Sequence, residues 1–251
     1  MNKRQSDILD LLRGHDGMSV RAMAERLRVT PATIRRDLDQ LAHEGRLVRD
    51  HGSAHLSQAG VVEFRFHEKG RKFAAEKRAI GRTVAEMIDG GMTVALDTGT
   101  TTLEVARSIA DRDGVTVVTT SLAIASVLHS QPGLEVVLLG GVVRKNVPDL
   151  TGVLTEENLK RFRVDLAVIG ADAVGRDGAF TTDLAVARGT QAMMAGAARS
   201  VLAADSGKFA AQALYKFAEV AAFDVVVTDG GLNEDDRAWL AKATEVILSG
   251  A

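Results

Sequence analysis

The chain has 251 residues, of which 31 are Lys or Arg and 33 are Asp or Glu, so its formal net charge is −2. This balance excludes a uniformly basic protein that coats DNA, although it allows a local basic face. The absence of cysteine excludes disulfides, thiolate catalysis and cysteine-bound metal centres. The N-terminal residues lack the pattern of a signal peptide, and no apolar run approaches the ~18 residues of a membrane span. We therefore expect a soluble, cytoplasmic protein with no membrane partner.

The N-terminal segment combines short amphipathic helices with a short ribbon. Three stretches have apolar residues at helical spacing, and a ribbon with a glycine-containing turn follows over residues 46–56. Ser19 is a suitable N-cap for the second helix, and Thr30 followed by Pro31 is a typical start for the third. This order of elements predicts a winged helix-turn-helix domain in residues 1–57.

The third of these helices exposes residues that suit a DNA major groove. On a helical wheel, Arg36 and Ala32 point away from the apolar stripe, with Thr33 and Arg35 on its flanks. Arginine at such a position bonds bidentately to guanine, and basic side chains on the ribbon meet phosphates or the minor groove. The expected DNA contacts are Ser19, Thr30, Ala32, Thr33, Arg35, Arg36, Arg46, Arg49 and His51. The alternative is a small helical domain with a solvated charged face.

From residue 92 onward the pattern changes to short, mostly β-branched apolar runs. The runs occupy residues 92–97, 115–120, 135–140, 165–172, 200–205, 224–229 and 245–249. Segments of helical length separate most of them, which is typical of a parallel sheet covered by helices. The sequence therefore predicts an α/β protein with a Rossmann-like effector domain over residues 76–251, which follows a linker over residues 58–75.

Polar and glycine residues follow several of these runs, at the sheet edge where α/β proteins bind ligands. Asp97 precedes Gly99–Thr102, where a glycine and the start of a helix form an anion-binding nest. Arg144 is a candidate partner for a phosphate, and Asp172 is a candidate acceptor for sugar hydroxyls. The expected effector contacts are Asp97, Thr98, Gly99, Thr100, Thr101, Thr102, Thr120, Ser121, Gly141, Arg144, Asp172 and Lys208. The alternative for the nest is a capped strand–helix turn.

The predicted recognition helix and wing closely resemble those of the DeoR-type family of bacterial transcriptional regulators. The family pattern of Ser or Thr, any residue, then Ala-Thr-Ile-Arg-Arg-Asp-Leu is matched by Thr30 and by residues 32–38. The Gly-rich wing is matched by Gly52, with Ser53 in place of the usual second glycine. The effector-domain motifs of the family follow in order at Glu76–Ile80, Asp97–Thr102, Thr120–Ser121, Gly140–Gly141 with Arg144, Gly152, Gly170–Asp172 and Asp205–Phe209.

The resemblance covers essentially the whole chain and implies a function. The C-terminal domain of the family is similar to sugar-phosphate isomerases of the ribose-5-phosphate isomerase type, and it usually binds a phosphorylated sugar as inducer. We therefore expect a DNA-binding repressor of a carbohydrate catabolic operon, which a phosphorylated sugar releases from its operator. Since one winged unit reads too few base pairs for genomic specificity, we expect a homodimer or a tetramer on operator DNA.

One segment departs from the family pattern. Where the family often has a Glu and, one turn later, a Lys, this chain has Val186 and Thr190. The departure puts the usual effector contacts at these positions in doubt. Arg188 either substitutes as the cation or is a surface residue of the helix.

Two other functions are alternatives to the regulator. A sugar-phosphate isomerase with a DNA-binding or adaptor N-terminal domain would need a base, for which Asp97 and Asp172 are candidates. The chain lacks a run resembling the Lys-Gly-Gly-Gly loop and catalytic Glu of the isomerases, so we expect no catalytic residues. A nicotinamide-sensing repressor would need a G-x-G-x-x-G motif after the first strand, which is missing. The histidines have no metal-ligand spacing, so we expect neither a metal nor a cofactor.

Overall fold

The computed structural model describes residues 3–13, 17–43, 46–50, 52–56, 66, 69–145 and 147–250. The chain forms two compact units, which are described separately. One unit comprises Met1–Glu68 with Lys145–Val147, and the other comprises Lys69–Arg144 with Pro148–Ala251. No helix in the described ranges is long and apolar enough to cross a membrane.

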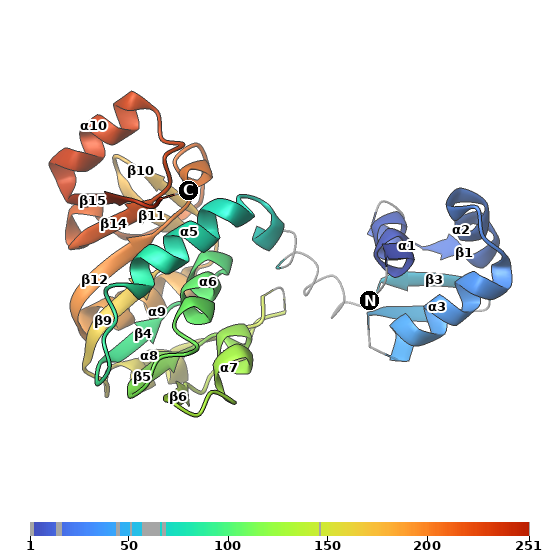
Figure 1. Cartoon of the computed structure of the whole chain (residues 1–251), viewed down its shortest axis with the longest axis horizontal. Coiled ribbons are helices and arrows are strands. Elements are labelled where there is room, and N and C mark those ends of the chain that lie inside the picture. Colours follow the sequence, from blue (N-terminus) through green and yellow to red (C-terminus); the bar gives the residue numbers. More distant parts are fainter. Residues whose placement is uncertain are drawn as a thin grey trace. The chain divides into compact units, whose positions relative to one another are not determined.

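The N-terminal unit packs helices against a small sheet (Figure 1). Its described elements are α1 (Lys3–Arg13), β1 (Met18–Ser19), α2 (Val20–Leu27), α3 (Pro31–His43), β2 (Leu47–Asp50) and β3 (Ser53–Leu56). The strands form an antiparallel sheet in the order β1-β3-β2. The predicted ribbon is therefore confirmed, but it gains a third strand because Met18 and Ser19 pair with β3.

A stripe of apolar residues on α3 holds this unit together. Ile34, Leu38 and Leu41 are 0% exposed and pack in one cluster with Ile8 of α1 and Met23 of α2. Each such burial contributes roughly 1.5–3 kcal/mol relative to exposure. The same stripe fixes which side of α3 faces outward.

A seven-stranded parallel sheet forms the centre of the C-terminal unit (Figure 1). Its strands are β4 (Thr93–Leu96), β5 (Val115–Thr119), β6 (Leu134–Leu138), β9 (Val164–Ile169), β12 (Ala197–Ala203), β14 (Val225–Thr228) and β15 (Glu245–Leu248). They run in the order β15-β14-β12-β9-β4-β5-β6, and every pairing between them is parallel. All seven predicted strands are confirmed. The chain winds outward in both directions from β4, so the switch point lies between β4 and β9.

Helices and short strands complete this unit. The helices are α5 (Ala74–Ala85), α6 (Thr100–Ser108), α7 (Leu122–Leu128), α8 (Val153–Leu159), α9 (Leu184–Ala195) and α10 (Glu234–Ala243). The short strands are β7 (Val142–Val143), β8 (Leu150–Thr151), β10 (Ala173–Gly175), β11 (Gly178–Thr181) and β13 (Tyr215–Ala218). β7 pairs with β8, and β10-β11-β13 form an antiparallel sheet that the sequence pattern did not predict. Most of the predicted linker lies outside the described residues.

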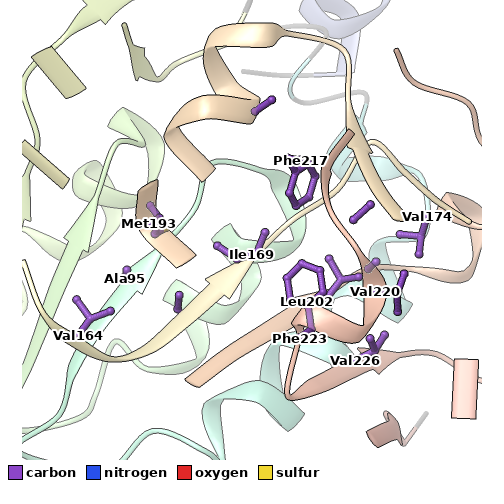
Figure 2. Packing of buried hydrophobic residues seen from close by; sticks show 14 of the residues in the cluster. Ala95, Val164, Ile169, Val174, Met193, Leu202, Phe217, Val220, Phe223 and Val226 are labelled. Carbon is purple, nitrogen blue, oxygen red and sulfur yellow. The ribbon is translucent and has the colours of Figure 1, made fainter. Parts of the chain in front are cut away.

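One face of the parallel sheet packs on an apolar core shared with α8, α9 and the β10-β11-β13 sheet. Figure 2 shows Ala95 and Ile169 from neighbouring strands together with Met193 of α9 and Phe217 of β13. This core fixes α9 against the sheet, so the N-terminal half of α9 stands at the edge where the strands end. That placement brings α9 to the residues after β4.

Candidate functional site

The exposed face of α3 carries the predicted recognition residues. Ala32, Arg35 and Arg36 are exposed and Thr33 is half-buried, whereas the apolar stripe of the same helix is buried. Among the described residues, neither Arg35 nor Arg36 takes part in an ion pair. Both guanidinium groups are therefore available to a ligand of α3.

Hydroxyl groups cap the starts of α2 and α3. The Ser19 Oγ accepts a hydrogen bond from the Ala22 backbone N–H at 3.2 Å. The Thr30 Oγ1 accepts from the Thr33 N–H at 3.2 Å and lies 2.9 Å from the Thr33 Oγ1. These caps confirm the predicted helix starts, and they fix the N-terminal end of α3 from which Arg35 and Arg36 project.

Two aspartates on α3 are neutralised by arginines from other elements. The buried Asp37 binds Arg4 of α1 through two contacts, at 2.5 and 3.2 Å. The exposed Asp39 pairs with Arg49 of β2. Arg49, a predicted DNA contact, is thus engaged within the unit, and Arg46 is half-buried. His51, the remaining predicted wing contact, lies outside the described residues.

A pocket opens in the C-terminal unit at the end of the sheet. It is lined by Asp97, Thr98, Thr120, Asp149, Leu150, Thr151, Thr155, Ala185, Val186, Gly189 and Thr190. About 260 Å³ of space lies between them, part of it open to solvent. The carboxyl ends of strands in an open α/β sheet are where such proteins bind ligands, so this position makes the pocket a candidate ligand site.

Asp97 is the buried carboxyl of this pocket. It is 5% exposed, its Oδ1 accepts from the Thr98 N–H at 2.8 Å, and its Oδ2 accepts from the Gly170 N–H at 3.4 Å. Burial raises the pKa of Asp97 to about 7, because the two N–H groups and Arg144 compensate only partly for the lost hydration. The negative charge of Asp149 contributes to this rise in the pKa.

Arg144 is held by carboxylates on both sides. Its Nε and Nη2 donate to the two oxygens of Asp149 at 2.6 and 2.5 Å, and its Nη1 lies 3.5 Å from Asp183 at the start of α9. Asp149 is 0% exposed, so this bidentate pair satisfies a carboxylate that burial would otherwise penalise. The predicted phosphate partner is therefore engaged with Asp149.

The Gly99–Thr102 loop lies beside the pocket. Gly99 has φ +152°, a conformation that favours glycine, and α6 begins at the next residue. Thr101 and Thr102 are buried, and the Thr102 Oγ1 donates to the Gly99 carbonyl at 3.1 Å. The Thr102 hydroxyl is thus engaged within the loop, while the backbone N–H groups of the first turn of α6 have no partner within that helix.

Glycine at position 141 is required by a close approach. A Cβ there would lie 2.0 Å from the Thr155 Oγ1 and 2.9 Å from the Thr151 carbonyl. Gly141 thus lets β7 pack against the start of α8. Ser121 has a structural role too. Its hydroxyl accepts a hydrogen bond from the Ile124 N–H at the start of α7, and its backbone forms an isolated β-bridge with Asp149.

Asp172 stands outside the pocket lining but is strongly bound. Its Oδ1 accepts from the Lys69 Nζ at 2.9 Å, and its Oδ2 accepts from the hydroxyls of Thr181 and Thr182 at 3.2 and 3.0 Å. Burial alone would raise the pKa of Asp172, but Lys69 and the Thr182 donors outweigh it and lower the pKa to about 2. Asp172 is consequently a fixed carboxylate.

Lys208 lies in a second cluster, after β12. The cluster is centred on Lys77 and Asp205, both at most 3% exposed, whose charged atoms are 3.7 Å apart. Burial lowers the pKa of Lys77 and raises that of Asp205. Lys208 is near enough to oppose the rise at Asp205, but it does not line the pocket. The burial of Lys77 was not predicted, although its spacing from Ile80 and Val84 places it on the apolar stripe of α5.

The structure therefore brings some predicted effector residues together and separates others. Asp97, Thr98 and Thr120 line the pocket, while Asp172 and Lys208 do not. The lining residues that the sequence analysis missed are Asp149, Leu150, Thr151, Thr155, Ala185 and Gly189. They carry no motif of their own. No group of acidic or histidine side chains within the described ranges is arranged to hold a metal ion.

Known proteins resemble both units. A family model for the DeoR-like helix-turn-helix domain matches residues 4–59, and one for the DeoR C-terminal sensor domain matches residues 72–230. The HTH-type transcriptional regulator GlpR of Haloferax volcanii is 32% identical over 99% of this chain and 97% of its own. The glycerol-3-phosphate regulon repressor of Escherichia coli is 29% identical over 90% of each chain. Ribose 5-phosphate isomerase A of Methanocaldococcus jannaschii shows a distant structural likeness, with a TM-score of 0.41 and 18% identity over 55% of each chain.

Proposed function

The chain belongs to the DeoR family of transcriptional regulators, and on this basis we propose that it represses a carbohydrate catabolic operon and leaves its operator when a phosphorylated sugar binds. The observation that carries the proposal is the combination of two features in one chain. One is the pair of unengaged arginines on the exposed face of α3. The other is a pocket at the carboxyl ends of β4 and β5, lined by carboxyl and hydroxyl groups.

The proposed DNA contacts lie on α3 and the wing. Arg35 and Arg36 bond to base edges in the major groove, with Ala32 and Thr33 beside them. Ser19, Thr30, Arg46, Arg49 and His51 are assigned to phosphates or the minor groove. For Arg49 this requires exchange of Asp39 for a DNA phosphate, which the exposure of the pair allows.

The proposed effector contacts form two groups, one for the phosphate and one for the sugar hydroxyls. The N–H groups at the start of α6 receive the phosphate, and the carboxylate and hydroxyl groups of the pocket receive sugar hydroxyls. The name of the Escherichia coli relative refers to a regulon for a phosphorylated polyol, which supports this ligand class. Asp172 and Lys208 follow β9 and β12 at the same sheet edge, outside the pocket, so we assign them to the phosphate-bearing end of the ligand.

We assign DNA binding to residues 1–57, the connection to residues 58–75 and effector sensing to residues 76–251. The active form is a homodimer or a tetramer, because two-fold symmetry places two winged units on the half-sites of a palindromic operator. The curated relatives are regulators and not enzymes, which decides against the isomerase hypothesis. The ligand signal acts through a difference in effector affinity between the DNA-bound and free states.

The experiment that tests this proposal selects an operator from random DNA and follows its binding by fluorescence anisotropy. The double variant Arg35→Ala with Arg36→Ala should weaken specific binding by about 1–3 kcal/mol per lost base contact. The matched control is Arg26→Ala, which removes an exposed arginine of α2. Phosphorylated sugars are then screened by thermal shift, where a ligand at 100 times its Kd adds about 2.7 kcal/mol of stability. An unchanged operator affinity in the double variant, or DNA release by none of the sugars that bind, would contradict the proposal.

A further inference from the structure

The wall of the pocket that α9 contributes is uncharged. Its lining residues are Ala185, Val186, Gly189 and Thr190. The nearest cation on this helix, Arg188, does not line the pocket. Its side chain is 59% exposed and pairs with Glu156 of α8 at 3.3 Å. The arrangement follows from helix geometry, since positions 185, 186, 189 and 190 share one face and position 188 lies off it.

The opposite side of the pocket is formed by two buried carboxyl groups, and no described Lys or Arg lines it. Asp97 and Asp149 are 5% and 0% exposed, and Asp149 is occupied by Arg144 in a bidentate pair. None of the described residues that line the pocket is Lys or Arg. An anionic group placed in this space would therefore face two buried carboxyl groups with no unpaired partner, which is strongly unfavourable.

The same space offers unused hydrogen-bonding groups. The Thr98 Oγ1 is buried and has no hydrogen-bond partner in the described part of the chain. The Asp97 Oδ2 has a single long contact, with Gly170 at 3.4 Å. Buried polar groups are normally satisfied, so both atoms indicate a ligand that donates and accepts hydrogen bonds. Leu150 and Val186 add apolar surface for the carbon chain of such a ligand.

We infer that this pocket takes the uncharged, hydroxyl-bearing part of the effector and excludes any second anionic group, with Val186 and Thr190 as the specificity-determining residues. The inference rests on the proposed function, in which the phosphate binds outside the pocket at the start of α6. The effector is then the monophosphate of a neutral sugar or polyol. Sugar bisphosphates and the phosphates of sugar acids are rejected, because their second charge has to enter the pocket.

The test uses the full chain and isothermal titration with matched compounds. Glucose 6-phosphate is compared with 6-phosphogluconate, and fructose 6-phosphate with fructose 1,6-bisphosphate, because each second compound adds one anionic group at the far end. Glycerol 3-phosphate serves as a small monophosphate, and glucose, fructose and glycerol serve as uncharged probes. We expect at least one monophosphate to bind, and its partner with the second charge to bind at least about 10-fold more weakly, a difference of 1.4 kcal/mol.

Variants of residues on α9 test which side chains discriminate between the singly and the doubly charged compounds. Thr190→Lys places a cation in the pocket. It should shift the ratio of the affinities for the two matched compounds by about 10-fold in favour of the doubly charged one. Because Thr190 is only 2% exposed, the nearly isosteric Thr190→Val is the second variant. It removes a hydroxyl from the pocket and should weaken the monophosphate about 5- to 10-fold. Arg188→Gln is the control and should leave every affinity within about 2-fold, since exposed ion pairs contribute little.

The outcomes separate this inference from the proposed function. Tighter binding of the bisphosphate or the acid phosphate by the unmodified protein, or an unchanged affinity ratio in Thr190→Lys together with an unchanged affinity in Thr190→Val, would overturn the inference alone. If glucose, fructose or glycerol binds and the phosphorylated compounds do not, the proposal of a phosphorylated effector is wrong, while the assignment of the pocket to an uncharged, hydroxyl-bearing group is retained. Binding of no compound in the set would overturn both.

Discussion

Asp97 and Asp172 follow neighbouring strands of one sheet, β4 and β9, and both are largely buried, yet their pKa values move in opposite directions. The pKa of Asp97 rises to about 7 and that of Asp172 falls to about 2. The two carboxyl groups differ in the hydrogen-bond donors that surround them. Asp97 accepts from two backbone N–H groups, whereas Asp172 accepts from the Lys69 ammonium and from the hydroxyls of Thr181 and Thr182.

The comparison teaches that burial alone does not set the charge of a carboxyl at this sheet edge. A carboxyl supplied with a cation and several donors stays ionised, while one supplied with few donors is half-protonated near neutral pH. Asp149, the most buried of the three, is bound by the Arg144 guanidinium through two hydrogen bonds. Four variants test this dependence on donors.

Arg144→Met should have the largest effect. It leaves the Asp149 carboxylate buried without its cation, which typically costs about 3–5 kcal/mol. Urea unfolding at fixed protein concentration measures the loss. The double variant Arg144→Met with Asp149→Leu removes both charges and should recover most of the stability. A double variant that is no more stable than Arg144→Met would show that the pair itself is not the cause.

Asp97→Asn should make stability less dependent on pH. An acid whose folded pKa lies above its unfolded value stabilises the fold at low pH, and this contribution is lost as the pH rises from about 4 to about 7. The raised pKa of Asp97 corresponds to a loss on the order of 3–4 kcal/mol across that window. Asparagine mimics the protonated acid, so the variant should lose less stability than the unmodified protein between pH 4 and pH 8. Parallel unfolding curves for the two proteins over this range would refute the raised pKa.

Asp172→Asn should show the opposite sign. The lowered pKa of Asp172 contributes stability that is present above about pH 4 and lost as the pH falls toward 2. The variant should therefore be about 2 kcal/mol less stable at pH 7. The difference from the unmodified protein should shrink in acid. Thermal unfolding at pH 7 and pH 3 provides the check, and a gap that does not narrow at pH 3 would contradict the assignment.

Lys69→Met should have the smallest effect. The Lys69 side chain is 56% exposed, so solvent screens its pair with Asp172 and the expected loss is below about 1 kcal/mol. The pKa of Asp172 should nevertheless rise toward its usual value. NMR titration of the Asp172 side-chain carboxyl measures this directly, with Lys160→Met, at an exposed position just after α8, as the control. An unchanged titration would mean that Thr181 and Thr182 hold the carboxylate by themselves.

Local sequence pattern predicted the parts of the molecule that depend on neighbours along the chain. The stripe of Ile34, Leu38 and Leu41 determines which side of α3 is buried, and so which side presents Arg35 and Arg36. The apolar runs predicted the seven strands, and parallel order placed Asp97 and Thr120 at one edge of the sheet. The first prediction rests on the 3.6-residue period of a helix, and the second on the continuous apolar runs that strands buried on both faces require.

Tertiary structure alone decided which side chains share the pocket and what charge they carry. Asp149 and Thr190 reach Asp97 from distant parts of the chain because a common core packs α8 and α9 on the sheet. The same packing directs Arg144 to Asp149, although its position after a strand suggested a free phosphate ligand. Hydrogen-bond partners and burial depend on distances across the fold, and a pKa depends on both. The sequence by itself therefore determined the N-terminal helices, the seven parallel strands and the family, while packing between elements determined the chemistry of the pocket.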